Sequence, residues 1–316
     1  MRRRSVVWAH RVALLIACGA LVCCSLLSTA DLTGGSHDAG GVGDALDALD
    51  APDGSIDDAP RLSDGPAGDR LVADTDAPVP RDGGCGGDGG PAMVYVDFGG
   101  GFCIDSTEVT AGQYAAWLGT NPRLDTQTPE CAWNPSYLPT TGWPLQAKDV
   151  NLPVVGVDWC DAYAYCKGVG KRLCGQIGGG SIVPLDLASL DDPSVSQWMA
   201  ACSRGGTRPL PYGQLAEPSA CNSRDHDDAG DFAVDAGSLA QCQGGYPGIF
   251  DMSGNVSEWE DSCDPPDGSV KEANCHLRGG EFYLEAYLDT CAFRRGYEDG
   301  RRDMTTDWIG FRCCSP

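Results

Sequence analysis

The residues of this chain best suited to chemistry are its cysteines. Of seventeen cysteines, three lie in the first thirty residues and fourteen follow. The fourteen are Cys85, Cys103, Cys131, Cys160, Cys166, Cys174, Cys202, Cys221, Cys242, Cys263, Cys275, Cys291, Cys313 and Cys314. An even number of cysteines in an exported chain predicts a disulfide framework, here of up to seven bridges. A thiolate metal site is disfavoured, because the sequence has no Cys-x-x-Cys pair and only two histidines after residue 92.

Other catalytic patterns are weaker. The vicinal Cys313 and Cys314 are a candidate redox pair, but two separate bridges are the interpretation we favour. A Ser–His–Asp triad would need His226 or His276, and neither lies in a nucleophile-elbow context. The glycine run at 178–180 is not followed by the Lys-Ser/Thr of a phosphate-binding loop, so it predicts a plain loop.

Residues 1–30 have the pattern of an export signal. Arginines within residues 2–11 precede an almost wholly apolar run at 12–27, and small residues follow it. The apolar run is short for a membrane-spanning helix. Two outcomes remain open. Cleavage after Ala30 would give a secreted protein. Alternatively, Leu15-Ile16-Ala17-Cys18 resembles a lipobox, whose acylated cysteine would anchor the protein at the cell surface or in the periplasm.

Composition divides the remaining chain in two. Residues 31–92 contain fourteen Asp, three Arg and no Glu or aromatic residue, which predicts a disordered acidic linker of net charge −11. Residues 93–316 contain every Phe and Tyr, as expected of one large folded domain. The net charge of that domain, −16, argues against nucleic acid and anionic membrane surfaces as partners. A lipid anchor would be the one membrane contact.

Capping residues predict three short helices in the domain. Their N-terminal signals are Thr110-x-x-Gln113, Asp158-Trp159-Cys160-Asp161 and Ser194-x-x-Gln197. Apolar runs at 93–98 and 310–313 predict strands. Gly, Pro and Asp are frequent elsewhere, so loops should dominate and the disulfides should hold them together.

Four segments in a fixed order carry a family resemblance. They are Asp105-x-x-Glu108-Val109-Thr110-x-x-Gln113-Tyr114; Pro153-Val154-x-x-Val157-Asp158-Trp159, continuing to Gly170-Lys171-Arg172-Leu173; Gly248-Ile249-Phe250-Asp251-Met252-Ser253-Gly254-Asn255-Val256-x-Glu258-Trp259; and Leu277-Arg278-Gly279-Gly280 with Gly310-Phe311-Arg312-Cys313. Together they resemble the formylglycine-generating enzyme, or sulfatase-modifying factor, family over about residues 93–315. The resemblance implies an α+β domain with an irregular, loop-rich, C-type-lectin-like fold.

The resemblance also locates the family's catalytic centre, and this chain lacks its two cysteines. Active members carry two cysteines, five residues apart, that bind copper and oxidise a substrate cysteine with oxygen; soft thiolates suit Cu(I). Leu284 and Asp289 stand at those positions here, and Glu281 replaces an active-site serine. We therefore expect no copper and assign no catalytic residue.

The same resemblance implies calcium as a cofactor. One site corresponds to Asp251, Gly254, Val256 and Glu258, whose carboxylate and carbonyl oxygens suit a hard cation. A second site corresponds loosely to Asn222 and Ser223, where a solvated acidic loop is an equal alternative. Its acidic ligand would be one of Asp225, Asp227, Asp228 and Asp231, among which the sequence does not decide.

Two disulfides are implied by the resemblance, Cys166–Cys313 and Cys202–Cys291. A third, Cys263–Cys275, is predicted from short sequence separation alone.

These observations favour an exported, non-catalytic binding or structural module whose partner is an unidentified surface protein or glycan. Fold analogy alone supports the binding role. The alternatives are a formylglycine-generating-type cysteine oxidase or other redox enzyme with a relocated site, and a purely mechanical spacer at the cell surface.

Overall fold

The structure is a computed structural model that describes residues 84–86, 89–182, 187–226, 232–264, 269–293 and 300–316. The predicted export signal and the predicted linker as far as residue 83 lie outside the described residues, so both stay predictions. In the described part of the chain, no helix has the length and apolar character needed to cross a membrane.

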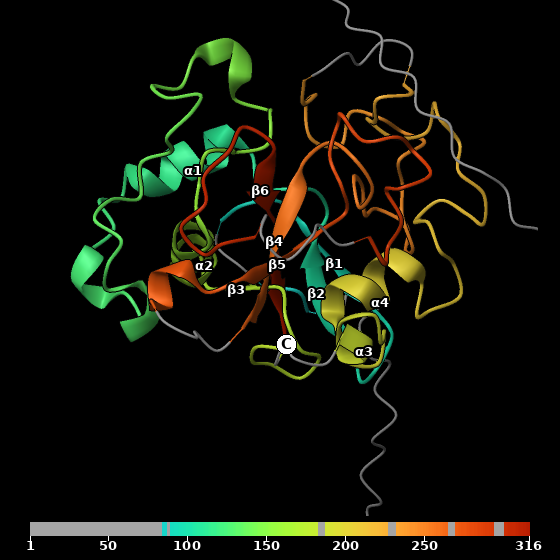
Figure 1. The fold of residues 1–316 in the computed structure, drawn as a ribbon, viewed down its shortest axis with the longest axis horizontal. Coiled ribbons are helices and arrows are strands. Elements are labelled where there is room, and N and C mark those ends of the chain that lie inside the picture. Colours follow the sequence, from blue (N-terminus) through green and yellow to red (C-terminus); the bar gives the residue numbers. More distant parts are fainter. Residues whose placement is uncertain (1–83, 87–88, 183–186, 227–231, 265–268, 294–299) are drawn as a thin grey trace, which may run out of the picture. The chain divides into compact units, whose positions relative to one another are not determined.

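Short elements joined by many turns build the domain (Figure 1). The helices are α1 (Ala111–Leu118), α2 (Trp159–Gly168), α3 (Leu187–Leu190) and α4 (Gln197–Ser203), with 3-10 turns η1 (Leu124–Thr126), η2 (Pro129–Cys131), η3 (Ala147–Asp149) and η4 (Val270–Glu272). An antiparallel sheet has the order β1 (Met93–Val96), β2 (Phe102–Asp105), β7 (Cys313–Ser315) and β3 (Arg172–Leu173). A second sheet has the order β5 (Cys275–Arg278), β4 (Ser257–Cys263) and β6 (Ile309–Phe311), with β4 parallel to β6. The predicted α+β, loop-rich fold class is confirmed.

Two of the three predicted helix caps are present. Thr110 and Asp158 form capping boxes at the starts of α1 and α2. The prediction for the third helix was wrong by two residues: the N-cap of α4 is Ser196, whose hydroxyl accepts from the Met199 amide at 3.0 Å. Ser194 bonds Asp192 instead. The Ser196 hydroxyl also donates to the buried Glu260 carboxylate at 2.7 Å, a partner that local sequence does not reveal.

The predicted C-terminal strand is divided at one residue. β6 ends at Phe311 and β7 begins at Cys313, so the chain passes from the second sheet to the first at Arg312. Arg312 is fully buried, and its side chain lies between the two sheets. The chain therefore carries a buried cation where its two sheets meet.

Two apolar clusters flank these strands. One packs α1 and α2 against β4 and β6, with Tyr114 and Tyr165 stacked at 5.5 Å and Phe311 edge-on to both. The other packs α4 against β1 and β2 around Trp198. In Figure 1, α1 and α2 accordingly lie on one side of the strands and α4 on the other.

Seven disulfides staple the domain, and they include the three expected pairs. The bonds are Cys85–Cys103, Cys131–Cys160, Cys166–Cys313, Cys174–Cys314, Cys202–Cys291, Cys221–Cys242 and Cys263–Cys275. Cys166–Cys313 and Cys202–Cys291 both have Cα atoms 5.6 Å apart, an ordinary separation. The vicinal Cys313 and Cys314 belong to separate bridges and do not pair with each other.

The folded part begins earlier than residue 93. Cys85 is bonded to Cys103 of β2, and the Pro91 carbonyl accepts from buried Lys171 at 2.8 Å. Composition placed these residues in the acidic linker, because the glycine-rich stretch around Cys85 has no apolar pattern. The disulfide at Cys85 and the hydrogen bond at Pro91 attach that stretch to the fold.

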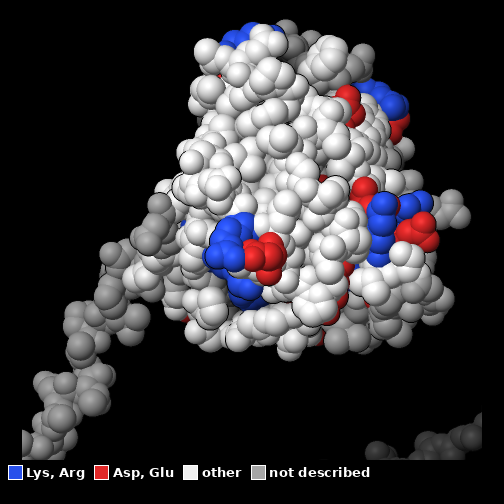
Figure 2. All heavy atoms as spheres, turned by 90° about the vertical axis from the view of Figure 1, so that its left-hand side faces the viewer, with Lys and Arg blue, Asp and Glu red and all other residues white. Residues whose placement is uncertain are grey.

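One side of the domain carries few charged side chains. Figure 2 shows the side on which α1 and α2 lie, where most of the visible surface is uncharged and the basic and acidic groups are isolated or paired. This contrasts with the net charge of −23 of the whole chain.

Candidate functional site

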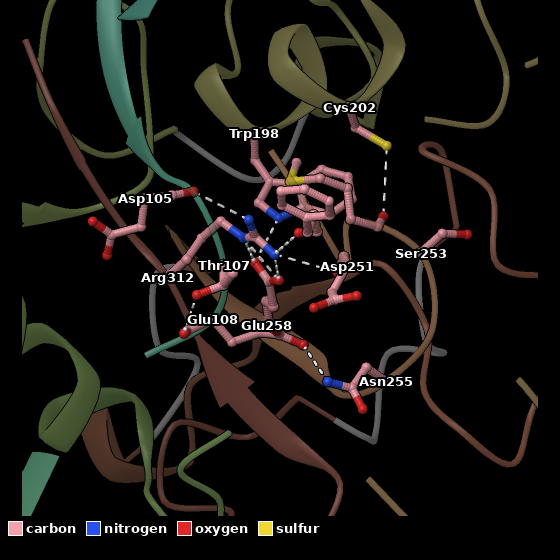
Figure 3. A network of polar contacts seen from close by, with 12 residues as sticks. Asp105, Thr107, Glu108, Trp198, Cys202, Asp251, Ser253, Asn255, Glu258 and Arg312 are labelled. Carbon is pink, nitrogen blue, oxygen red and sulfur yellow. Dashed lines mark hydrogen bonds and ion pairs between the residues drawn. The ribbon is translucent and has the colours of Figure 1, made fainter. Parts of the chain in front are cut away.

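The predicted metal ligands Asp251 and Glu258 lie beside the buried Arg312 (Figure 3). The Arg312 guanidinium donates to both oxygens of Glu258 at 2.6–2.9 Å. It also donates to the backbone carbonyls of Asp105, Phe250 and Asp251 at 2.9–3.2 Å. Charge-assisted, multiply bonded contacts of this kind are strong and directional.

Three carboxyl groups share this one guanidinium. Burial, with the charge of Asp251 adding to it, raises the pKa of Glu108 well above its usual range. Burial also raises the pKa of Asp251 to about 6. The Glu108 and Asp251 carboxyl groups raise each other's cost of ionisation, so protonation of one lowers the excess negative charge. The cluster is thus partly neutralised by Arg312 and partly by protonation.

The predicted calcium set Asp251, Gly254, Val256 and Glu258 fits a metal poorly. Both Glu258 oxygens accept from Arg312, and Oε2 also accepts from the Trp198 indole at 2.8 Å. Oδ2 of Asp251 accepts from the Gly237 amide. A buried carboxylate with all its acceptor positions directed at N–H groups offers calcium little, so Arg312 takes the place of a metal cation here.

The second predicted set fits calcium better. Asn222 and Ser223 are buried, and Asn222 Oδ1 and Ser223 Oγ have no hydrogen-bond partner in the described part of the chain. The Asn222 amide nitrogen is held by Phe232 and Asn255. Oxygens left unsatisfied in this way are what a hard cation would use. Asp225 instead accepts from the Ala286 amide, and Asp227, Asp228 and Asp231 lie outside the described residues.

These oxygens do not belong to a cluster of charged ligands. Among the residues that the structure describes, no three His, Cys, Asp or Glu side chains are arranged to hold a metal. Among the described residues, a calcium ion at Asn222 and Ser223 would therefore find amide, hydroxyl and backbone oxygens. Weak, millimolar sites are typical of ligand sets with few charges.

The loop that corresponds to the family's catalytic centre has no thiol. Leu284 is half-buried, Asp289 is buried, and neither offers sulfur. Cys291, the one cysteine of the loop, is bonded to Cys202, and Cys314 is bonded to Cys174. The seven bonds account for all fourteen cysteines after residue 84, so in the oxidised protein no thiolate is left to bind Cu(I).

Asp289 lies in a tight backbone cradle. A Cβ atom built on Gly280 would be 1.9 Å from Asp289 Oδ1, and one on Gly254 would be 3.4 Å from Oδ2. Both glycines have positive φ, which side-chain-bearing residues rarely adopt. The Ser253 hydroxyl donates to the Asp289 backbone carbonyl, but neither carboxylate oxygen has a partner among the described residues.

Burial, with the charges of Asp225 and Glu285 adding to it, raises the pKa of Asp289 to about 9. At neutral pH this side chain is a neutral carboxylic acid. The position that holds a metal-binding cysteine in active family members therefore holds an uncharged, buried acid in this protein.

Sequence reasoning missed the groups at the centre of the site. It singled out neither Arg312 nor Glu108 as a site residue, although both belong to segments that carry the resemblance. The charge interaction between them joins residues 204 positions apart, and no local pattern encodes such a pairing.

Comparison with known proteins identifies the family. Residues 66–315 match the sulfatase-modifying factor enzyme 1-like domain, which is most of the chain. The chain therefore belongs to this family, as the four segments indicated.

The relatives include proteins described as inactive. Inactive C-alpha-formylglycine-generating enzyme 2 of Mus musculus is 30% identical over 199 residues, which are 59% of this chain and 56% of the relative. The Bos taurus protein of the same name is 29% identical over 179 residues, 52% of this chain and 51% of that protein. The matched region thus spans about half the length of these relatives. Serine/threonine-protein kinase pkn1 of Chlamydia pneumoniae is 28% identical over 176 residues, 51% of this chain and 23% of the kinase.

Similar solved structures include CarF, at 19% identity and a TM-score of 0.46 over 73% of this chain and 95% of that one. PvdO from Pseudomonas aeruginosa has 19% identity and a TM-score of 0.45 over 68% of this chain and 80% of that one.

Replacing Asp289 by Asn tests the buried acid. A carboxyl group whose folded-state pKa exceeds its unfolded value destabilises the fold progressively as the pH rises from about 4 to about 9. We expect the free energy of unfolding of Asp289→Asn to match that of the parent near pH 4. At pH 7.5 it should exceed that of the parent by on the order of a few kcal/mol, so the variant should unfold at higher urea concentration. Urea unfolding followed by tryptophan fluorescence measures the difference, and Asp97→Asn at an exposed carboxylate is the matched control. A gain that does not change with pH would show that Asp289 is ionised in the folded protein.

Proposed function

We propose that this protein is an exported binding module built on a sulfatase-modifying-factor-like domain that has no cysteine-oxidase activity. One observation carries the proposal: every cysteine after residue 84 is in a disulfide, so no thiol is free near Leu284 and Asp289, where the family resemblance implies the copper-binding cysteines. The relatives named as inactive enzymes are consistent with it.

Seven disulfides support an oxidising compartment as the place where the protein folds and works. Export through the signal at 1–30, with or without acylation of Cys18, would deliver the chain to such a compartment. The acidic stretch between Asp31 and residue 83 would then act as a spacer between the membrane or secretion site and the folded domain.

We also propose calcium at Asn222 and Ser223. Support comes from their two buried, unpartnered oxygens, and from the family resemblance that places a site there. The ion would connect the 220–223 turn to neighbouring backbone and so stabilise a region with little regular structure. It would not take part in catalysis.

The alternative function, a cysteine oxidase, can be tested directly, and we expect no activity. The purified chain, supplied with Cu(I), oxygen and a peptide containing Cys-x-Pro-x-Arg, should form no aldehyde and consume no oxygen above background. A Leu284→Cys, Asp289→Cys double variant is the matched control, because it restores two soft ligands and should bind Cu(I) more tightly than the parent. Turnover by the parent that Cys291→Ser abolishes would overturn the proposal.

Removal of calcium should lower the melting temperature. Calcium at 100 times its Kd, about 0.1 M for a millimolar site, stabilises the folded state by about 2.7 kcal/mol, which corresponds to about 5–10 °C for a domain of this size. Melting curves with excess EGTA, and again after calcium is restored, measure the shift. We expect Ser223→Ala to reduce the shift and Ser262→Ala, which removes another buried and unpartnered hydroxyl, to leave it unchanged. An identical melt in chelator would contradict calcium binding.

A further inference from the structure

A cavity of about 410 Å³ opens beside the C-terminal ends of α1 and α2 and shares no residue with the Arg312 cluster or the Asp289 loop. Its size lies within the usual range of small-ligand pockets. The walls come from Trp117 on α1, Tyr163 and Lys167 on α2, and the segment between residues 120 and 137. This is the sparsely charged side of the domain that Figure 2 shows.

The apolar part of the wall is aromatic and rigid. Trp117 and Tyr137 pack at 5.2 Å between ring centroids, and the Tyr137 carbonyl accepts from the buried Tyr114 hydroxyl at 2.8 Å. The Cys131–Cys160 disulfide joins the segment to α2 within the lining itself. The cavity therefore exists before any ligand binds, which lowers the entropic cost of binding.

The remainder of the wall is rich in hydroxyl and amide groups. Five lining residues of this kind are contributed by one stretch of chain: Thr120, Asn121, Thr126, Gln127 and Thr128. Gln127 is held in place by a bond from its Nε2 to the Asn134 carbonyl at 2.9 Å. Its Oε1 and the Thr128 hydroxyl have no partner in the described part of the chain. Such groups match a ligand with several hydroxyls better than a purely apolar one.

The charge of the lining is opposite to that of the protein. No Asp or Glu lines the cavity, although the chain has a net charge of −23. Of the two basic residues, Arg123 is paired with Asp125. Lys167 is exposed in the last turn of α2, with no ion pair among the described residues. One cation is thus available to a ligand.

We propose that this cavity binds a carbohydrate that carries a carboxylate, of the uronic acid class. Tyr163, a half-buried aromatic residue of the lining, suits the C–H face of a sugar ring, the hydroxyl and amide groups suit its hydroxyls, and Lys167 suits its carboxylate. The inference rests on the proposed function as a binding module and names the site and ligand class of that module.

Binding of D-glucuronate and D-galacturonate to the full chain tests the inference, with D-glucose and D-galactose as neutral partners. Isothermal titration calorimetry or tryptophan fluorescence should show saturable binding of a uronate that is tighter than that of its neutral parent. Lys167→Glu should weaken uronate binding at least about tenfold, as expected from loss of a charge-assisted hydrogen bond. Lys148→Glu, at an exposed lysine outside the lining, should leave it unchanged.

No saturable binding of either uronate would overturn the inference, as would equal binding by the parent and Lys167→Glu. Tighter binding of the neutral sugars would overturn the inference that the ligand carries a carboxylate. None of these outcomes affects the proposed lack of oxidase activity, which the copper and oxygen assay decides independently.

Discussion

The interaction on which the rest of the domain depends is the contact between the Arg312 guanidinium and the Glu258 carboxylate. Both groups are essentially inaccessible to solvent, and three hydrogen bonds of 2.6–2.9 Å join them. Arg312 lies between the last strands of the two sheets, Glu258 belongs to β4 of one, and Asp105 at the end of β2 belongs to the other. A single side chain thereby ties together two sheets that share no strand, and the loop at 250–251 is fixed by the same guanidinium.

That contact explains the limits on chemistry at this place in the fold. Removing one partner of a buried ion pair strongly destabilises the folded protein, because the other charge is left buried without compensation. Glu258 is accordingly committed to Arg312 and Trp198, and burial raises the pKa of both Glu108 and Asp251 beside it. Asp289, at a position where the family resemblance implies a metal-binding cysteine, is buried, and its pKa is raised to about 9. This region is therefore a buried polar core without a thiol, and a ligand-sized cavity of about 410 Å³ lies beside α1 and α2.

Much of the fold and of the candidate site could be predicted from the sequence where the signal is local or belongs to a recognisable segment. The caps of α1 and α2 follow from the pairs Thr110 with Gln113 and Asp158 with Asp161, because a capping box is a contact across three residues. The loss of the copper-binding pair is visible directly in Leu284 and Asp289. The choice of Ser196 over Ser194 was not predictable in this way, since it depends on a bond to Glu260, 64 residues away.

The same distinction applies to bridges and charges. Cys174–Cys314 and Cys85–Cys103 were not assigned, because cysteine counting leaves connectivity open and no segment of the resemblance contains Cys85. The break of the last strand at Arg312 was missed because the sequence of residues 310–313 has the pattern of one continuous strand. Only the fold shows that the run crosses between sheets.

The most direct measurement is a double-mutant cycle on Arg312→Met and Glu258→Gln, scored by urea unfolding with the disulfides intact. If the pair holds the two sheets together, Arg312→Met alone should lower the free energy of unfolding by about 3–5 kcal/mol. The cycle as a whole should give a coupling energy of about 2 kcal/mol or more between the two residues. The exposed pair Arg123–Asp125 gives the comparison, and there the coupling should stay below about 1 kcal/mol. A coupling between Arg312 and Glu258 no larger than that of the exposed pair would contradict the central role of the buried guanidinium.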